Sequence, residues 1–256
     1  MRFTARIGIC VCLVASVSGC QGVPVSHKGN HRLRPLEDVL KSPAAAHQEG
    51  IAAAALLDTS GSMRDRLTDA DGISRAKLAI AQRALMDLVR QFQNFAQKNP
   101  DRKVLLGIYD FSSRGDEEPC REVVKLGPPD LRSAETAVAS LRGSGGTPIG
   151  NAMIRAKHEL DATGMSRRHI LVITDGENNR GYSPGDVANA ISHLSGEERA
   201  SIYFIAFDVS ARHFDSVREA GGLVLSANNE RDLRQALDFV LTGKILVEQP
   251  VSPGTK

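Results

Sequence analysis

A carboxylate and two hydroxyls occupy alternate positions in one short segment of this 256-residue chain. Asp58, Ser60 and Ser62 lie in the run Asp-Thr-Ser-Gly-Ser-Met, directly after the apolar residues 51–57. If that apolar run is a strand of an open parallel sheet, the three side chains follow its carboxyl end, where such sheets bind ligands. Their oxygens are hard donors, which suit Mg²⁺, Mn²⁺ or Ca²⁺ better than metals that prefer nitrogen or sulfur. The segment therefore predicts a site for a divalent cation.

The Asp-x-Ser-x-Ser spacing resembles the metal-ion-dependent adhesion site of von Willebrand factor type A domains. Residues 145–150, Gly-Gly-Thr-Pro-Ile-Gly, resemble the threonine loop of that family, with Thr147 at the ligand position. Residues 174–178, Thr-Asp-Gly-Glu-Asn, resemble its aspartate segment, with Asp175 at the matching position. The three segments occur in the order of the family, and the resemblance covers roughly residues 50–242. It implies one cation site formed by Asp58, Ser60, Ser62, Thr147 and Asp175.

The resemblance also implies how such a site works. In the family the serine hydroxyls, and often the threonine, contact the metal directly, while the aspartates act largely through bound water. Neutral direct ligands leave the charge of the cation under-compensated, so a carboxylate of a partner protein completes its coordination. Mg²⁺ is the expected ion, with Mn²⁺ or Ca²⁺ as alternatives, because Mg²⁺ keeps several waters in a site with few protein ligands. We therefore expect a protein-binding module rather than an enzyme.

Further polar residues are candidates for the rim of this site. Glu177 and Asn178 follow Asp175, and Asp208 ends another apolar run, although a solvated loop also accounts for the first two. Two other functions stay open, namely a structural or assembly role in a cell-envelope complex and a Mg²⁺-dependent phosphohydrolase that uses Asp58 as nucleophile. The haloacid dehalogenase-like hydrolases carry a second aspartate where this chain has Ser60, which disfavours the phosphohydrolase.

Apolar runs alternate with amphipathic segments, a pattern typical of parallel βαβ units. We expect helices at residues 134–141, 148–160, 184–194 and 231–241, and strands at 51–57, 104–111, 169–174, 201–207 and 223–226. Another helix is expected from Ser74, whose hydroxyl can cap it. Propensity alone would make the alanine-rich run before Asp58 a helix, and it is assigned as a strand only because of the motif that follows. The expected fold is a doubly wound α/β domain, with a mostly parallel central sheet flanked by helices in a Rossmann-like arrangement.

The N-terminal residues resemble a bacterial lipoprotein signal. Arg2 and Arg6 precede the uncharged run 7–17, which is too short to span a bilayer in the usual way. The run leads into Val-Ser-Gly-Cys, which resembles the lipobox whose cysteine receives diacylglycerol. Acyl chains on Cys20 would anchor the mature protein in the cell envelope. Gln21 resembles the pattern that sorts Gram-negative lipoproteins to the outer membrane, and an ordinary secretory signal is the alternative.

The sequence predicts one folded domain at residues 48–243, between a signal peptide at 1–19, a tether at 20–47 and a flexible tail at 244–256. The two arginines of the signal account for the formal net charge of +2, so the mature chain is near neutral and has no basic stripe typical of nucleic-acid binding. Cys120 is then the remaining thiol and forms no internal disulfide.

Overall fold

The structure, a computed structural model, describes residues 33–43, 45–68, 72–115, 117–196 and 198–248. The predicted signal peptide and Cys20 lie outside the described residues. Among the residues described, no helix is long and apolar enough to cross a membrane.

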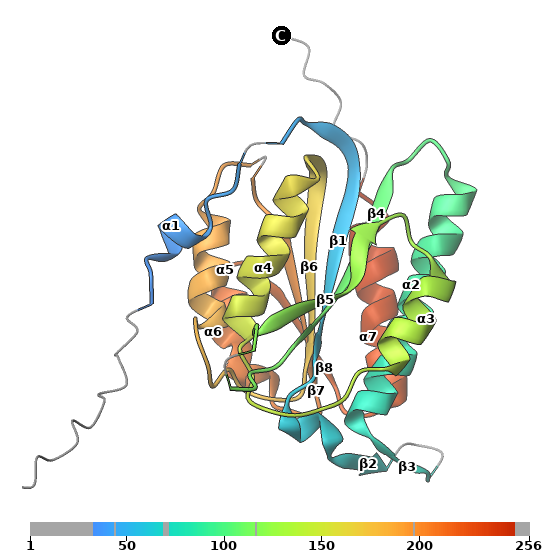
Figure 1. The fold of residues 1–256 in the computed structure, drawn as a ribbon. Helices are drawn as coiled ribbons and strands as arrows, with labels where there is room; N and C mark the ends of the chain where they lie inside the picture. The colour runs from blue at the N-terminus through green and yellow to red at the C-terminus, as the bar shows by residue number, and fades with distance from the viewer. Residues whose placement is uncertain (1–32, 44, 69–71, 116, 197, 249–256) are drawn as a thin grey trace, which may run out of the picture. The chain divides into compact units, whose positions relative to one another are not determined.

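A six-stranded sheet forms the centre of the domain, in the order β5-β4-β1-β6-β7-β8 (Figure 1). Five strands run parallel, and they are β1 (Gln48–Asp58), β4 (Val104–Phe111), β6 (Met165–Thr174), β7 (Ser201–Phe207) and β8 (Leu223–Ala227). The edge strand β5 (Cys120–Gly127) runs antiparallel to β4. Strand β1 lies between β4 and β6, so the strands that follow it in sequence are added to the sheet on both of its sides. At such a topological switch point, a crevice forms at the carboxyl ends of the strands. The predicted doubly wound, mostly parallel sheet is confirmed.

Helices cover both faces of the sheet (Figure 1). One face packs against α2 (Lys77–Lys98), α3 (Leu131–Ala139) and α7 (Glu230–Val240). The other packs against α4 (Ile149–Ala162), α5 (Pro184–Ser192) and α6 (Asp215–Glu219). The short elements are α1 (Leu36–Val39), η1 (Gly61–Arg64), η2 (Ala211–Phe214), η3 (Leu241–Ile245) and a hairpin of β2 (Arg66–Thr68) and β3 (Ser74–Ala76).

The alanine-rich strand β1 contributes to both halves of the core. Ala53 and Ala55 pack with the α2 side, whereas Ala52 and Ala54 pack with the α4 side. Successive side chains of a strand point to opposite faces, and a strand buried on both faces shows a continuous apolar run. Here the burial on both faces overrides the preference of alanine for helices.

Helix α2 begins later than the sequence predicted. Ser74 belongs to β3, where it pairs with Thr68, and its hydroxyl accepts a hydrogen bond from Arg66 Nε at 3.1 Å. The N-cap of α2 is Ala76, and no side chain caps the helix there. The hairpin therefore uses the serine that was predicted to cap the helix, and α2 starts at Lys77.

The folded unit extends past both predicted boundaries. Residues 33–43 and 45–47, assigned to the tether, lie against α4 and α5. Leu40 is buried there, and His158 Nε2 lies 2.6 Å from the carbonyl oxygen of Val39. In the predicted tail, Ile245 and Leu246 are buried against the core. Short apolar groups in both segments thus bury area on the domain, which composition alone did not reveal.

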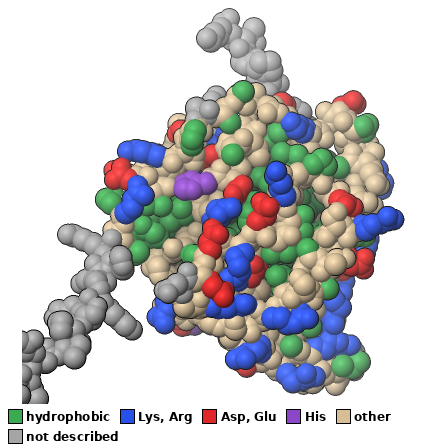
Figure 2. Space-filling model, in the orientation of Figure 1, with side chains coloured by type: hydrophobic (Ala, Val, Ile, Leu, Met, Phe, Trp, Pro, Cys, Tyr) green, Lys and Arg blue, Asp and Glu red, His purple; other side chains and the backbone are tan. Residues whose placement is uncertain are grey.

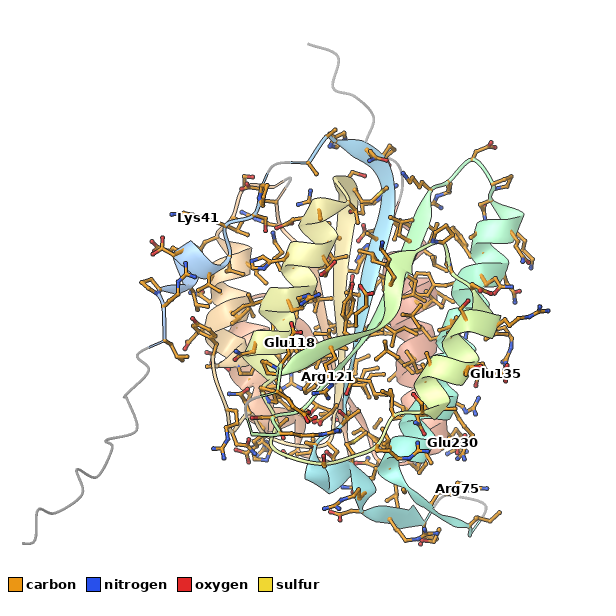
Figure 3. The ribbon with its side chains drawn as sticks, in the orientation of Figure 1. Lys41, Arg75, Glu118, Arg121, Glu135 and Glu230 are labelled. Atoms are coloured by element: carbon orange, nitrogen blue, oxygen red, sulfur yellow. The ribbon has the colours of Figure 1, made fainter. Side chains whose placement is uncertain are left out.

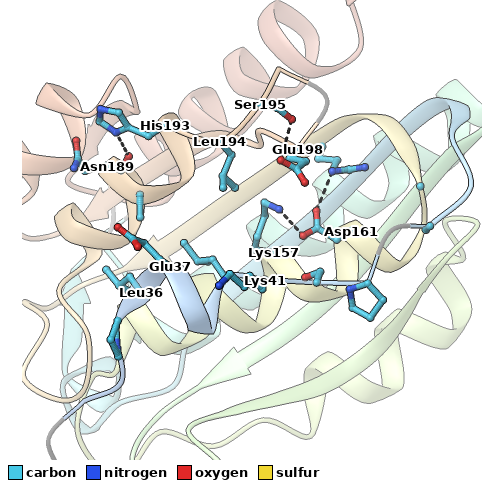
Figure 4. Close-up of a pocket in the computed structure, with 18 of the residues that line it drawn as sticks. Leu36, Glu37, Lys41, Lys157, Asp161, Asn189, His193, Leu194, Ser195 and Glu198 are labelled. Carbon is cyan, nitrogen blue, oxygen red and sulfur yellow. Dashed lines mark hydrogen bonds and ion pairs between the residues drawn. The ribbon is translucent and has the colours of Figure 1, made fainter.

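A cavity of about 1180 Å³ lies between the N-terminal residues 35–43 and helices α4 and α5 (Figure 4). Lys157 and Asp161 pair on its wall, and Arg168 Nη1 contacts Asp161 Oδ1 at 2.9 Å. Burial lowers the pKa of Lys157, although the contact with Asp161 opposes that shift. None of the residues predicted for the cation site lines this cavity.

Candidate metal site

The structure brings all five residues predicted for the cation site to one edge of the sheet. Asp58 is the last residue of β1, and Ser60 and Ser62 follow it in the turn that leads into η1. Asp175 directly follows β6, the neighbour of β1. Thr147 stands two residues before the first residue of α4. The carboxyl ends of β1 and β6 therefore position the two aspartates, and loops position the three hydroxyls.

Hydrogen bonds connect four of these residues. Asp58 Oδ1 accepts from the backbone N–H of Ser60 at 2.7 Å, and its Oδ2 accepts from Thr174 Oγ1 at 2.6 Å. Ser60 Oγ lies 3.1 Å from Ser62 Oγ. Ser62 Oγ in turn donates to Asp175 Oδ1 at 2.7 Å. These hydrogen bonds connect Asp58 with Asp175 across the ends of the two strands, through the backbone N–H of Ser60 and the hydroxyls of Ser60 and Ser62.

Both aspartates are buried, and burial disfavours a bare carboxylate. Burial raises the pKa of Asp58 to about 7, although the hydrogen bonds from Thr174 and Ser60 oppose that shift. Burial also raises the pKa of Asp175, against the effects of Ser62 and Lys77. Two buried carboxylates this close together would gain from a cation between them, because it would compensate the charge that burial penalises.

Glycines let the threonine loop approach the end of β1. Gly145 has a φ of +83°, and a Cβ on it would overlap the carbonyl oxygen of Ser113. Its own carbonyl oxygen accepts from the N–H of Gly61 at 2.9 Å, and the N–H of Ser144 donates to Thr59 O at 2.7 Å. A Cβ on Gly176 would lie 3.6 Å from Ser62 Oγ and 3.7 Å from Thr147 Oγ1, so these two hydroxyls flank the same point. The glycines thus let this loop bend close to the end of β1.

Two asparagines after Asp175 hold the threonine loop in place. Asn178 Oδ1 accepts from the N–H groups of Ile149 at 2.8 Å and Gly150 at 3.4 Å, and so caps the start of α4. Asn179 Oδ1 accepts from the N–H of Thr147 at 2.9 Å, and the N–H of Asn179 donates back to Thr147 O at 3.1 Å. The side-chain oxygen of Asn178, a predicted rim residue, is therefore committed to the backbone of α4.

A lysine joins Asp175 to Asp208, one of the other two rim candidates. Lys77 Nζ lies 3.2 Å from Asp175 Oδ2 and 2.8 Å from Asp208 Oδ2. Burial lowers the pKa of Lys77, but its contacts with Asp208 and Asp175 outweigh this and raise the pKa overall. Asp208 has a φ of 54°, a left-handed conformation that is uncommon outside glycine. Glu177 is exposed and pairs with His213 Nδ1 at 2.9 Å.

An ion pair between the buried Asp110 and the partly exposed Arg121 supports the turn after β1. Thr59 Oγ1 donates to Asp110 Oδ2 at 2.8 Å, and the guanidinium of Arg121 binds both oxygens of Asp110. Arg121 comes from the edge strand β5 and also donates to the carbonyl oxygen of Glu118 at 3.1 Å; both residues are labelled in Figure 3. The residue between Asp58 and Ser60 is thereby fixed to β4 and β5.

The donor set fits a hard divalent cation. Two carboxylates and three hydroxyls offer only oxygen, which is the ligand type of Mg²⁺, Mn²⁺ and Ca²⁺. Within the described part of the chain, no three Asp, Glu, His or Cys side chains gather as a metal site. The candidate site has only two aspartates, and three hydroxyl groups supply its other oxygen donors.

Comparison with known proteins identifies the family of this fold. The sequence profile of the von Willebrand factor type A domain matches residues 54–238, most of the chain. The chain belongs to the von Willebrand factor type A family. A search of curated proteins finds no match to the chain.

Solved structures share the fold of this von Willebrand factor A domain at low sequence identity. A conserved hypothetical protein, BatB from Bacteroides thetaiotaomicron, has a TM-score of 0.55 and 17% identity, over 75% of this chain and 99% of its own. The von Willebrand factor type A protein from Catenulispora acidiphila has a TM-score of 0.59 and 20% identity, over 80% of this chain and 44% of its own. The PilB minor pilin from Streptococcus sanguinis has a TM-score of 0.58 and 14% identity, over 80% and 63%. The chain thus spans less than two thirds of the last two proteins.

Sequence reasoning missed Lys77 and Thr174, which contact Asp175 and Asp58 in this A domain, and it did not predict that Asn179 binds Thr147. A signal existed for Lys77, since a cation in the first turn of a helix opposes the helix dipole and so points to some other partner. Thr174 was also open to inference, because it ends a buried strand directly before Asp175. No local pattern distinguishes Asn179 from any polar loop residue.

Proposed function

We propose that this A domain binds an acidic group of a protein partner through a divalent cation, Mg²⁺ in the first place, at the site of Asp58, Ser60, Ser62, Thr147 and Asp175. The observation that carries the proposal is the convergence of these residues from three separate segments, with Ser62 hydrogen-bonded to Asp175 across 113 positions of sequence. A bound cation would supply an electrophilic centre for the partner's carboxylate. The chain's own residues provide the hydroxyl ligands and the buried negative charge that retains the ion.

Charge around the site supports an acidic partner. Figure 2 shows Lys and Arg side chains gathered at the lower end of the molecule, over the hairpin and the segment after β1. Exposed arginines occur in the segments that follow β1, α3, β6 and β7, and they are Arg64, Arg66, Arg142, Arg180 and Arg212. A positive rim steers an acidic surface toward the cation and speeds its association.

The burial of Asp58 favours binding over phosphotransfer. A nucleophilic aspartate has to reach the phosphorus atom of its substrate. Asp58 is fully buried, and each of its oxygens already accepts a hydrogen bond, from Ser60 and from Thr174. These contacts suit a residue that stabilises a cation from behind its direct ligands.

We further propose that the mature protein is anchored to the cell envelope, favouring the outer membrane, through a lipid on Cys20. The lipobox-like sequence before Cys20 supports this anchor. A tethered domain encounters envelope partners at a raised effective concentration, so a modest affinity for a single acidic group would suffice.

Titration calorimetry of the full-length protein in detergent tests the cation site. Mg²⁺ should bind the wild type, and Asp58→Ala should abolish this binding while the domain stays folded by circular dichroism. Ser62→Ala keeps both aspartates and should weaken binding, so it tests the site even if the first variant unfolds. Asp38→Ala, in the exposed pair with Lys41, is the matched control and should bind as the wild type does.

An immobilised peptide with one aspartate, compared with the same peptide carrying asparagine, tests the partner chemistry. The wild type should retain the aspartate peptide in Mg²⁺ and release it in EDTA. Equal retention of both peptides would contradict the proposed carboxylate recognition. Hydrolysis of p-nitrophenyl phosphate that is lost in Asp58→Ala would contradict the binding function itself.

A further inference from the structure

Lys77 contacts two carboxylates at the edge of the candidate site. Its ammonium group lies 3.2 Å from Asp175 Oδ2 and 2.8 Å from Asp208 Oδ2. The side chain of Asp175 is fully buried, and its other oxygen accepts from Ser62 at 2.7 Å. The two oxygens of Asp175 are therefore divided, with one on the hydroxyl chain of the site and the other on Lys77.

The backbone around this contact is held in an unusual way. Asp208 follows β7 with a φ of 54°, and among the described residues other than glycine it alone has a positive φ. Its N–H donates to Ala227 O at 2.8 Å, which ties this conformation to the neighbouring strand β8. The N–H of Lys77 donates to Asp65 O at 2.9 Å, so both ends of the Lys77–Asp208 pair are fixed by the backbone. A left-handed aspartate costs free energy, which the pair with Lys77 helps to offset.

We propose that Lys77 determines the cation specificity of the site, because it withdraws one oxygen of Asp175 and the carboxylate of Asp208 from the bound ion. This inference rests on the proposed cation binding and adds a residue that selects the ion. When Asp58, Asp175 and Asp208 are all ionised they carry three negative charges, and Lys77 neutralises one of them.

The coordination demands of the two physiological ions turn this into a preference. Ca²⁺ takes 6–8 oxygen ligands, often with a bidentate carboxylate, whereas Mg²⁺ is usually bound by one or two carboxylates and several waters. With Lys77 in place, Asp175 offers one oxygen and Asp208 is paired, which suits Mg²⁺. Without Lys77, a bidentate Asp175 and a free Asp208 would become available, which suits Ca²⁺.

Calorimetric titration of Mg²⁺ and Ca²⁺ into full-length protein in detergent tests this role. Lys77→Met keeps the apolar stem of the side chain and removes its charge. We expect Lys77→Met to bind Ca²⁺ roughly tenfold more tightly than the wild type and to gain less for Mg²⁺, so that the preference shifts toward Ca²⁺. Lys98→Met, at the exposed end of the same helix, makes the same change in net charge and should leave both affinities unchanged.

Asp208→Asn provides the opposite perturbation. Asparagine tolerates the left-handed backbone, and its loss of charge leaves Lys77 to pair with Asp175 alone. Asp208→Asn should therefore weaken both ions, opposite in sign to Lys77→Met, whereas a purely structural role would shift both variants in the same direction. Thermal unfolding in EDTA shows whether each variant is folded.

The outcomes separate this inference from the proposed function. A wild type that binds neither ion would overturn both. If the wild type binds Mg²⁺, but Lys77→Met binds Ca²⁺ and Mg²⁺ within about twofold of the wild-type affinities or more weakly, the role of Lys77 is overturned. The cation site itself would stay supported.

Discussion

Removal of Arg121 should destabilise the domain, because Asp110 would be left as a buried charge without its cation. Asp110 is 4% exposed, and Arg121 binds both of its carboxylate oxygens. Breaking a buried pair by removing one partner costs about 3–5 kcal/mol. Asp110 keeps the hydroxyl of Thr59 at 2.8 Å, so we expect Arg121→Met to lie at the low end, about 3 kcal/mol.

Urea denaturation of the wild type and Arg121→Met measures this loss in the free energy of unfolding. In thermal unfolding, the same loss should lower the melting temperature by roughly 6–12 °C in a domain of this size. Arg155→Met is the matched control. Arg155 pairs with Glu118 at 2.6 Å and Glu159 at 2.8 Å in more exposed positions, and its loss should cost at most about 1 kcal/mol.

A second variant separates the buried charge from the lost contacts of the arginine. Adding Asp110→Asn to Arg121→Met removes the unpaired charge and should recover about 1–2 kcal/mol. Equal destabilisation by Arg121→Met and Arg155→Met, or a double variant less stable than Arg121→Met alone, would refute the reasoning. Since Thr59 lies beside Asp58, Arg121→Met should also weaken Mg²⁺ binding.

Three further predictions concern other parts of the chain. Burial lowers the pKa of His169 from 6.5 to about 3, so the folded state binds fewer protons than the unfolded state between these values, and stability falls as the pH falls. Between pH 7 and pH 5 this costs about 2 kcal/mol, which denaturation should show for the wild type relative to His169→Phe, and an imidazole that titrates near pH 6.5 in NMR spectra would contradict it. A Cβ on Gly150 would overlap the carbonyl oxygen of Tyr182, so Gly150→Ala should displace the start of α4, destabilise the domain by about 1–3 kcal/mol and weaken Mg²⁺ binding, whereas Gly196→Ala, where a Cβ meets open space, should do neither. Cys20→Ala should release the protein from the membrane fraction of a cell that processes lipoproteins, and unchanged retention would argue against lipidation.

The strands with continuous apolar runs were predictable because they are buried on both faces. The strand at Ser201–Phe207 has the bounds that the sequence predicted, and Val104–Phe111 does too. The edge strand Cys120–Gly127 was not expected. Its run of mixed charged and apolar residues is half-buried against a single neighbour, so it lacks the periodicity of a central strand.

The candidate site was predictable where chemistry is local in sequence, and not where it depends on tertiary contacts. The spacing of the carboxylate and hydroxyls after β1, and their place after an apolar run, indicate a cation site from the sequence. The contact of Lys77 with Asp175 joins residues 98 positions apart, and the loop clamp of Asn179 on Thr147 joins residues 32 apart. Sequence analysis predicts such polar residues to be exposed to solvent, because the residues next to them do not indicate their distant partners.

The position of β1 between β4 and β6 has a consequence for hydrogen exchange. Its amides from Ile51 to Leu57 are enclosed by strands on both sides, so we expect them to exchange only when the whole domain unfolds. Residues 143–147, which contain the first part of the threonine loop, are held by a few hydrogen bonds and should exchange through local opening. A cation bound to Asp58 and Thr147 would therefore join a segment that hardly opens to one that opens often. Its addition should slow exchange in the loop and leave β1 unchanged.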